Sequence, residues 1–108
     1  MSKFCIIFIT TADLKQARSI SKALLKAKLV ACVNIIKGIE SLFWWQGKID
    51  NAKETLLVIK TKKILFKKIS ELVSKLHSYD TPEIISFSLE KISLKYQRWL
   101  DASIIKSA

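Results

Sequence analysis

The chain has few of the residues that interrupt regular structure, with 2 glycines and 1 proline among its 108 residues. Half of the residues are hydrophobic, which excludes a disordered or collagen-like chain and predicts one folded domain over residues 1–108. No apolar run approaches the roughly 18 residues of a membrane-spanning segment, so we expect no membrane partner. The apolar run at residues 4–9 is shorter than the ~7–15 residues of a signal-peptide core, which favours a cytoplasmic protein.

Cysteine is also scarce, and the two cysteines present are Cys5 and Cys32. Neither belongs to a Cys-x-x-Cys pair or to a cluster with histidine, so the chain has no disulfide framework and no zinc-ligand set. Both cysteines lie in apolar runs that are typical of strands. We therefore expect two buried free thiols.

Charge of one sign, in contrast, is abundant: 19 basic and 9 acidic residues give a net charge of +10. Such an excess suits an anionic partner such as nucleic acid. The lysines, however, are spread along the chain, and the densest group lies at residues 60–68. Only Arg18 and Arg98 supply the guanidinium fork that phosphate and base recognition favours, so nucleic acid is an unlikely partner.

Hydrophobic periodicity predicts the order β-α-β-β-α-β, followed by a last helix. The expected strands are residues 3–9, the two arms of a hairpin within residues 29–61, and residues 83–89. The expected helices are residues 14–27, capped by Asp13 or Thr11, residues 62–76, and a short helix that begins after Ser93. This order predicts an α+β, ferredoxin-like fold, with an antiparallel four-stranded sheet and both main helices on one face. The strand that begins at residue 29 then lies at an edge of the sheet.

The central hairpin has a recognisable turn and bend. Gln46-Gly47 separates its arms, and Gly47 can adopt the positive φ that a two-residue hairpin turn requires. Lys37-Gly38 interrupts the alternation of the first arm, which predicts a bulge there.

Three adjacent aromatic residues lie near the tip of this hairpin. Phe43 and Trp45 point to one face of the ribbon and Trp44 points to the other. A hairpin tip in a small monomer has at least one solvated face, so these side chains need another surface to cover them. Packing against a partner chain is favoured over a ligand platform built from Trp44 and Trp45.

Four segments carry a resemblance to a known family. They are LVACVNI at residues 29–35, SLFWWQGKI at 41–49, ETLLVIKT at 54–61 and YDTPEI at 79–84. Together, and in this order, they resemble the CutA divalent-cation tolerance family over nearly the whole chain. The resemblance implies a ferredoxin-like fold, a tight homotrimer similar to the PII signalling proteins, and a cytoplasmic or organellar location. The homotrimer would supply the surface that the aromatic tip requires.

The candidate binding residues are Glu54, Lys60, Tyr79 and Glu83, which match polar positions of the family. One interpretation is a cleft between subunits where two carboxylates, an amine and a phenol converge. The other is an interfacial salt bridge of Lys60 with Glu54 or Glu83. Six residues separate Glu54 from Lys60, so both point to the same face of their strand. The chain has no nucleophile elbow, phosphate loop or zinc-ligand pair, so we expect no enzyme activity.

Copper is the metal that the resemblance implies. In bacterial relatives its donors correspond to Ile9 and to Leu76-His77 of this chain, and two of these three residues are aliphatic. Cys5 lies four residues before Ile9, roughly 13 Å away along a strand, and cannot replace it. His77 remains as a candidate for weak binding of Cu²⁺ or another divalent cation, and we expect no high-affinity copper site.

Two functions follow from the resemblance. The first is a non-catalytic trimeric protein in the response to divalent metal ions. The second is a PII-like sensor that binds a small anionic metabolite or nucleotide in a cleft between subunits. Lys62 and Lys63, at the predicted helix start beside Lys60, would suit such an anion.

Overall fold

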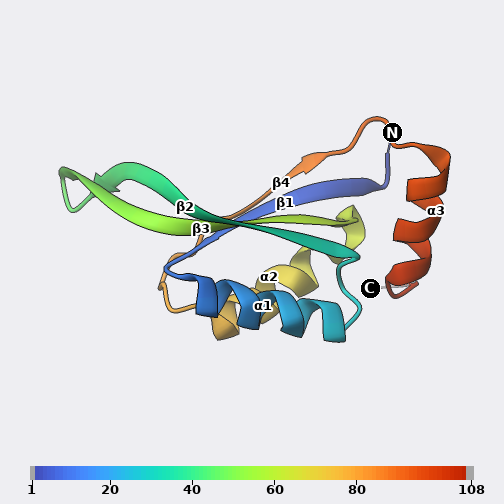
Figure 1. Cartoon of the computed structure of the whole chain (residues 1–108), viewed down its shortest axis with the longest axis horizontal. Helices are drawn as coiled ribbons and strands as arrows, with labels where there is room; N and C mark the ends of the chain where they lie inside the picture. Colours follow the sequence, from blue (N-terminus) through green and yellow to red (C-terminus); the bar gives the residue numbers. More distant parts are fainter. Residues whose placement is uncertain (1, 107–108) are drawn as a thin grey trace.

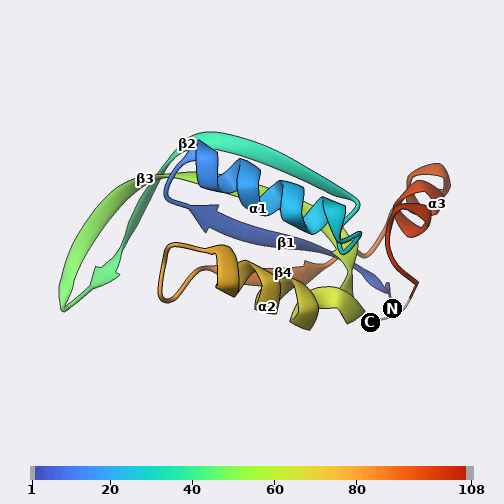
Figure 2. The same ribbon diagram turned by 90° about the horizontal axis from the view of Figure 1, so that it is seen from below.

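In the computed structural model, residues 2–106 form an antiparallel four-stranded sheet and three α-helices (Figure 1). The elements in chain order are β1 (Phe4–Thr11), α1 (Leu14–Lys26), β2 (Cys32–Trp45), β3 (Lys48–Lys62), the 3-10 turn η1 (Lys63–Leu65), α2 (Phe66–Leu76), β4 (Ile84–Ser88) and α3 (Leu94–Ser103). The strand order is β2-β3-β1-β4, which places β2 at an edge as predicted. Figure 2 shows α1 and α2 side by side on one face of the sheet, so the ferredoxin-like prediction is confirmed. None of these helices is long and apolar enough to cross a membrane.

The core lies between the sheet and the pair α1 and α2. Ile7 and Ile9 of β1 pair with Ile59 and Leu57 of β3, and all four side chains are fully buried. The helices contribute fully buried residues at helical spacing: Ala17, Ile20 and Leu24 of α1, and Ile69 and Val73 of α2. Full burial of one aliphatic side chain stabilises the fold by roughly 1.5–3 kcal/mol. This layer therefore fixes both helices on the sheet.

The start of α1 follows the predicted capping pattern in part. Asp13 is the N-cap, and its Oδ1 accepts a hydrogen bond from the Gln16 backbone N at 2.8 Å. The Gln16 side chain bonds elsewhere: its Oε1 accepts a hydrogen bond from Ser78 Oγ at 3.2 Å. Thr11 is not the cap: β1 extends two residues beyond its predicted end, and Thr11 pairs with Thr55 of β3.

The second helix was predicted to begin at about residue 62, and its α-helical part begins four residues later. Lys62 is the last residue of β3, where it pairs with Phe4, and the Lys63 backbone N donates to the carbonyl of Lys3 at 2.9 Å. These ladder contacts hold the backbone extended through Lys62. Residues Lys63–Leu65 then form a 3-10 turn, and the α-helix begins at Phe66.

The turn and the bulge of the hairpin are both confirmed. Trp45 pairs with Lys48, and the two residues between them have positive φ, 48° at Gln46 and 77° at Gly47. This is the combination of a type I′ turn, whose twist matches that of the two strands. The register shifts between Ile36 and Ile39, around Gly38 with φ of 72°.

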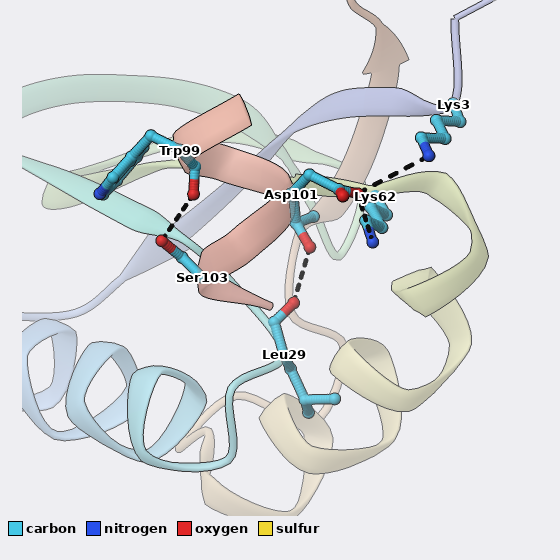
Figure 3. A network of polar contacts seen from close by, with 7 residues as sticks. Lys3, Leu29, Lys62, Trp99, Asp101 and Ser103 are labelled. Atoms are coloured by element: carbon cyan, nitrogen blue, oxygen red, sulfur yellow. Dashed lines mark hydrogen bonds and ion pairs between the residues drawn. The ribbon is translucent and has the colours of Figure 1, made fainter. Parts of the chain in front are cut away.

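Helix α3 closes the end of the sheet opposite to the hairpin tip (Figure 1). Its Leu100 is fully buried in the same core as Phe4. The buried Lys62 amine lies 2.8 Å from Oδ1 of Asp101, and Lys3 Nζ lies 3.6 Å from the same oxygen (Figure 3). The hydrogen bond from Lys62 lowers the pKa of the Asp101 carboxyl. The ion pair thus holds α3 on the last residue of β3.

Candidate functional site

The hairpin projects beyond the rest of the sheet. Strand β1 ends at the pair Thr11 and Thr55, so residues 39–54 form a two-stranded ribbon without a third strand (Figure 1). The ribbon contributes little to the core of its own chain, because all of residues 39–54 are exposed or partly exposed.

Large apolar side chains are exposed on both faces of this ribbon. Trp44 pairs with Ile49 across the strands, and their exposed fractions are 73% and 67%. Leu42 lies on the same face two residues away, 67% exposed. Phe43 and Trp45 point to the opposite face, where Trp45 is 59% exposed. The structure therefore places the three aromatics as the sequence predicted, with both faces of the tip uncovered within the chain.

A second apolar surface lies on the face of the sheet opposite to α1 and α2. Phe8 of β1 pairs with Ile85 of β4 and Ile6 pairs with Phe87, so these four side chains point to one face. Phe8 and Phe87 pack edge to face, with ring centroids 5.1 Å apart. About half of the Ile85 and Phe87 side chains remains exposed. We call this surface the open face. It was not singled out from the sequence, although the apolar residues at every second position of β1 and β4 could have indicated it.

Glu54 and Tyr79 are the two candidate residues that the structure brings together. Glu54 lies on β3 at the base of the ribbon, and Tyr79 follows α2 in the loop before β4. The Tyr79 hydroxyl donates a hydrogen bond to Glu54 Oε2 at 2.7 Å. Partial burial of the phenol, followed by its hydrogen bond to Glu54 and the negative charge there, raises the pKa of Tyr79 to about 12. At neutral pH the phenol is therefore a hydrogen-bond donor that fixes the loop to the hairpin.

Lys60 and Glu83 lie apart from this pair. Six strand residues place Lys60 roughly 20 Å from Glu54, and its amine donates to Asn34 Oδ1 on β2. Within residues 2–106, neither of the ion pairs formed contains Lys60 or Glu83. The interfacial salt bridge of Lys60 with Glu54 or Glu83 was predicted between subunits, so it stays a prediction. Convergence of the four residues would need more than one chain.

His77 is buried at the end of α2, and both of its ring nitrogens are used by the fold. Nδ1 lies 3.0 Å from the Tyr79 backbone N and must accept its hydrogen. The proton of the neutral ring is then on Nε2, which donates to the carbonyl of Thr10 at 2.7 Å. In this arrangement no ring lone pair is free for a metal ion. Residues 2–106 also contain no group of three or more His, Cys, Asp or Glu side chains that could hold one.

The cysteines match the prediction only in part. Cys5 is fully buried, and this burial raises the pKa of its thiol. Cys32 is only partly buried, because it begins the edge strand β2, so the prediction of burial was wrong there. Strand β3 separates their strands, as expected, and both cysteines are free. Burial, and then proximity to Cys32, raises the pKa of Tyr96 on α3, a contact that the sequence did not indicate.

Neither of two hollows on the surface contains the candidate residues. One, of about 870 Å³, lies between the start of β1, the end of β4 and α3, and it is lined by Ser2, Lys3, Phe4, Ser88, Glu90 and Gln97. The other, of about 340 Å³, lies on the outer side of α1 and is lined by Leu14, Lys15, Arg18, Ser19 and Lys22. The arrangement offers two exposed apolar surfaces and a loop that is hydrogen-bonded to the hairpin.

Comparisons with known proteins agree with this architecture. Residues 5–103 match the family model described as CutA1 divalent ion tolerance protein. A chloroplastic CutA 1 of Oryza sativa is 37% identical over 102 residues, and a divalent-cation tolerance protein CutA of Archaeoglobus fulgidus is 40% identical over 98 residues. The matches cover 94% and 91% of this chain. They cover 58% of the rice protein and 95% of the archaeal protein, so the chain spans little more than half of its plant relative.

Solved structures of CutA proteins from the same two organisms superimpose closely. The crystal structure of CutA1 from Oryza sativa aligns with a TM-score of 0.94 at 36% identity, covering 96% of this chain and 95% of that one. The structure described as the periplasmic divalent cation tolerance protein CutA from Archaeoglobus fulgidus aligns with a TM-score of 0.90 at 39% identity, covering 93% and 97%.

Proposed function

The chain belongs to the CutA1 divalent ion tolerance family, and from this membership we propose that it acts in tolerance of divalent cations as a non-catalytic homotrimer. The observation that carries the proposal of an assembly is the hairpin tip, where Trp44, Trp45 and Ile49 are more than half exposed. Monomeric proteins rarely leave a contiguous apolar surface of this kind uncovered.

The open face gives the second argument for assembly. A ferredoxin-like sheet covered by helices on one side leaves the other side to solvent, and here that side carries Phe8, Ile85 and Phe87. Covering one large aromatic stabilises an assembly by roughly 2–3 kcal/mol. A closed ring of three copies would cover the open faces in its centre and leave α1 and α2 outside.

The part played by the metal is proposed to be indirect or weak. A copper site needs several nitrogen, sulfur or carboxylate donors. His77 is committed to Thr10 and Tyr79 through its two nitrogens, so binding would first have to break a contact of the fold. Metal tolerance would then arise from an interaction of the assembled protein, rather than from tight storage of Cu²⁺ by each chain.

No observation favours the second candidate function, a sensor of an anionic metabolite or nucleotide. Two of the three amines that were expected to receive the anion, those of Lys60, Lys62 and Lys63, have other roles: Lys62 is buried against Asp101, and Lys60 is bonded to Asn34. Tyr79 and Glu54, two residues of the cleft that this function would use, form a hydrogen bond with each other.

We also propose that the protein acts in the cytoplasm. Its relatives include proteins named as chloroplastic and periplasmic.

The proposal can be tested by growth and by ligand-induced stabilisation. A host that lacks a relative of this family is supplied with the chain and grown in increasing Cu²⁺ and Zn²⁺. We expect the parent to raise the tolerated concentration, and the variant Trp45→Asp, which places a charge on the assembling surface, to lose this effect. A thermal-shift series with nucleotides provides the contrast, because a ligand that binds only the folded protein raises its melting temperature. Strong stabilisation by a nucleotide, with no effect on metal tolerance, would instead support the sensor.

A further inference from the structure

The net charge of the chain is concentrated on α1 and α2. Helix α1 carries the exposed cations Lys15, Arg18, Lys22 and Lys26 and no acidic residue. Helix α2 carries the exposed Lys67, Lys68 and Lys75 against the single acid Glu71. Seven basic residues and one acidic residue leave +6 on these 24 residues, whereas the remaining 84 residues share +4 of the total of +10.

None of these seven cations forms an ion pair within the described part of the chain. The ion pairs within residues 2–106 join Asp101 to Lys3 and to Lys62, and neither involves α1 or α2. The two helices lie side by side on the outside of the sheet, so their exposed residues form one two-helix surface, which we call the basic face (Figure 2). A surface with this excess of one charge attracts polyanions.

The basic face also has features that distinguish between polyanions. Lys15, Arg18 and Lys22 line the hollow of about 340 Å³ together with Leu14 and Ser19, which gives three cations and a hydroxyl around a space open to solvent. Two exposed aliphatic side chains lie at the ends of these helices: Leu25 is 42% exposed near the end of α1, and Ile64 is 63% exposed in η1, just before α2.

We propose that the basic face is a docking surface for an anionic lipid bilayer, with lipid phosphate groups as the ligands of its lysines and of Arg18. Lysine amines on long stems reach headgroup phosphates, while aliphatic side chains such as Leu25 and Ile64 enter the interfacial layer. Nucleic acid fits less well, because one of the seven cations is an arginine and neither helix exposes an aromatic side chain for base stacking. Such docking needs no membrane-spanning segment, so the proposal replaces the expectation of no membrane partner, which was based only on the lack of a spanning run.

Co-sedimentation of the full chain with lipid vesicles tests the proposal. The vesicles are phosphatidylcholine alone, or phosphatidylcholine with phosphatidylserine. We expect the parent to bind only the vesicles that contain phosphatidylserine, and to be released by added salt. Because each interfacial cation contributes roughly a fivefold factor in binding, the variant K15E/R18E/K22E should bind about a hundredfold more weakly or not at all.

A matched variant separates the basic face from net charge alone. K91E/K95E/R98E also reverses two lysines and one arginine, all exposed, on and before α3, and both variants have a net charge of +4 instead of +10. We expect the affinity of this control for vesicles that contain phosphatidylserine to fall by less than about fivefold. If a reversal variant fails to fold by circular dichroism, the neutral variants K15Q/R18Q/K22Q and K91Q/K95Q/R98Q are compared instead. Equal losses in the two sets, no binding of the parent to phosphatidylserine, or tighter binding of duplex DNA than of the vesicles would overturn the proposal.

Discussion

The hydrogen bond from Tyr79 to Glu54 can be removed almost without changing the shape of either residue. Tyr79→Phe deletes only the hydroxyl that lies 2.7 Å from Glu54 Oε2. Glu54→Gln keeps an acceptor oxygen and deletes the charge. The two substitutions therefore separate the contribution of the bond from that of the carboxylate.

The magnitude follows from the type of bond and its exposure. A hydrogen bond to a charged group contributes roughly 1.5–3 kcal/mol to stability when it is buried. Both side chains here are partly exposed, so solvent screening reduces this to about 1 kcal/mol. Glu54 remains accessible to water after Tyr79→Phe, so we expect no further penalty for an orphaned carboxylate. Tyr79→Phe should therefore lower the free energy of unfolding by about 1 kcal/mol.

Urea unfolding of the parent, both single variants and the double variant, at one fixed chain concentration, measures this. A double-mutant cycle should give a coupling energy above zero but below about 1 kcal/mol, because glutamine at position 54 keeps an acceptor oxygen and only the part of the bond that depends on the charge is lost. Additive effects, with a coupling energy near zero, would refute the reasoning.

The contact between Tyr79 and Glu54 also predicts that the stability of the fold depends on pH in the alkaline range. The pKa of Tyr79 is about 12 in the folded chain, above the value of about 10 for an unperturbed tyrosine. The folded chain then keeps the phenolic proton that the unfolded chain loses, so the stability contribution is complete below about pH 10 and is lost as the pH rises through about 12. Absorbance titration of tyrosinate should show this late ionisation and its absence in Tyr79→Phe. In Glu54→Gln the pKa of Tyr79 should fall but stay above the ordinary value for tyrosine, because burial is the largest cause of its rise.

Three further predictions concern the hairpin, the histidine and the thiols. Trp45→Ala should lower the melting temperature and shift the protein to smaller species on dilution, measured by sedimentation velocity; an unchanged variant would place the anchor of the assembly elsewhere. Cu²⁺ titration against a competing chelator should show only weak binding that is equal in the parent and in His77→Ala, and submicromolar binding lost in the variant would contradict this. A thiol reagent should modify Cys32 faster than Cys5 in the folded chain and both at the same rate after denaturation, and rapid modification of Cys5 would contradict its burial.

Local sequence signals were sufficient for most of the fold. Positive φ at Gly47 was predictable because a two-residue hairpin turn requires positive φ, which glycine adopts at no steric cost. The Asp13 cap was predictable because its carboxylate satisfies a free backbone N–H. The start of α2 was not predictable from its own residues. Its position depends on Lys62 pairing with Phe4, far away in the chain, and such tertiary contacts override local helix preference.

The candidate site was predictable only in part, for the same reason. The positions of Trp44 and Trp45 followed from strand alternation, and the exposure of Cys32 followed only from the edge position of β2. The hydrogen bonds of His77 depend on the distance between the end of α2 and the end of β1, which no spacing in the sequence reveals. The charge of α1 and α2 appeared scattered along the chain and became one surface only when the two helices were placed side by side.

The most direct test of the account is the native mass of the parent protein, because the proposed function depends on a closed assembly that covers the hairpin tips and the open faces. Light scattering coupled to size exclusion, over a dilution series that extends below micromolar concentration, measures this mass. The account predicts a single species of three chains of 12.3 kDa each, or about 37 kDa, at every concentration. A stable species of 12.3 kDa would contradict it.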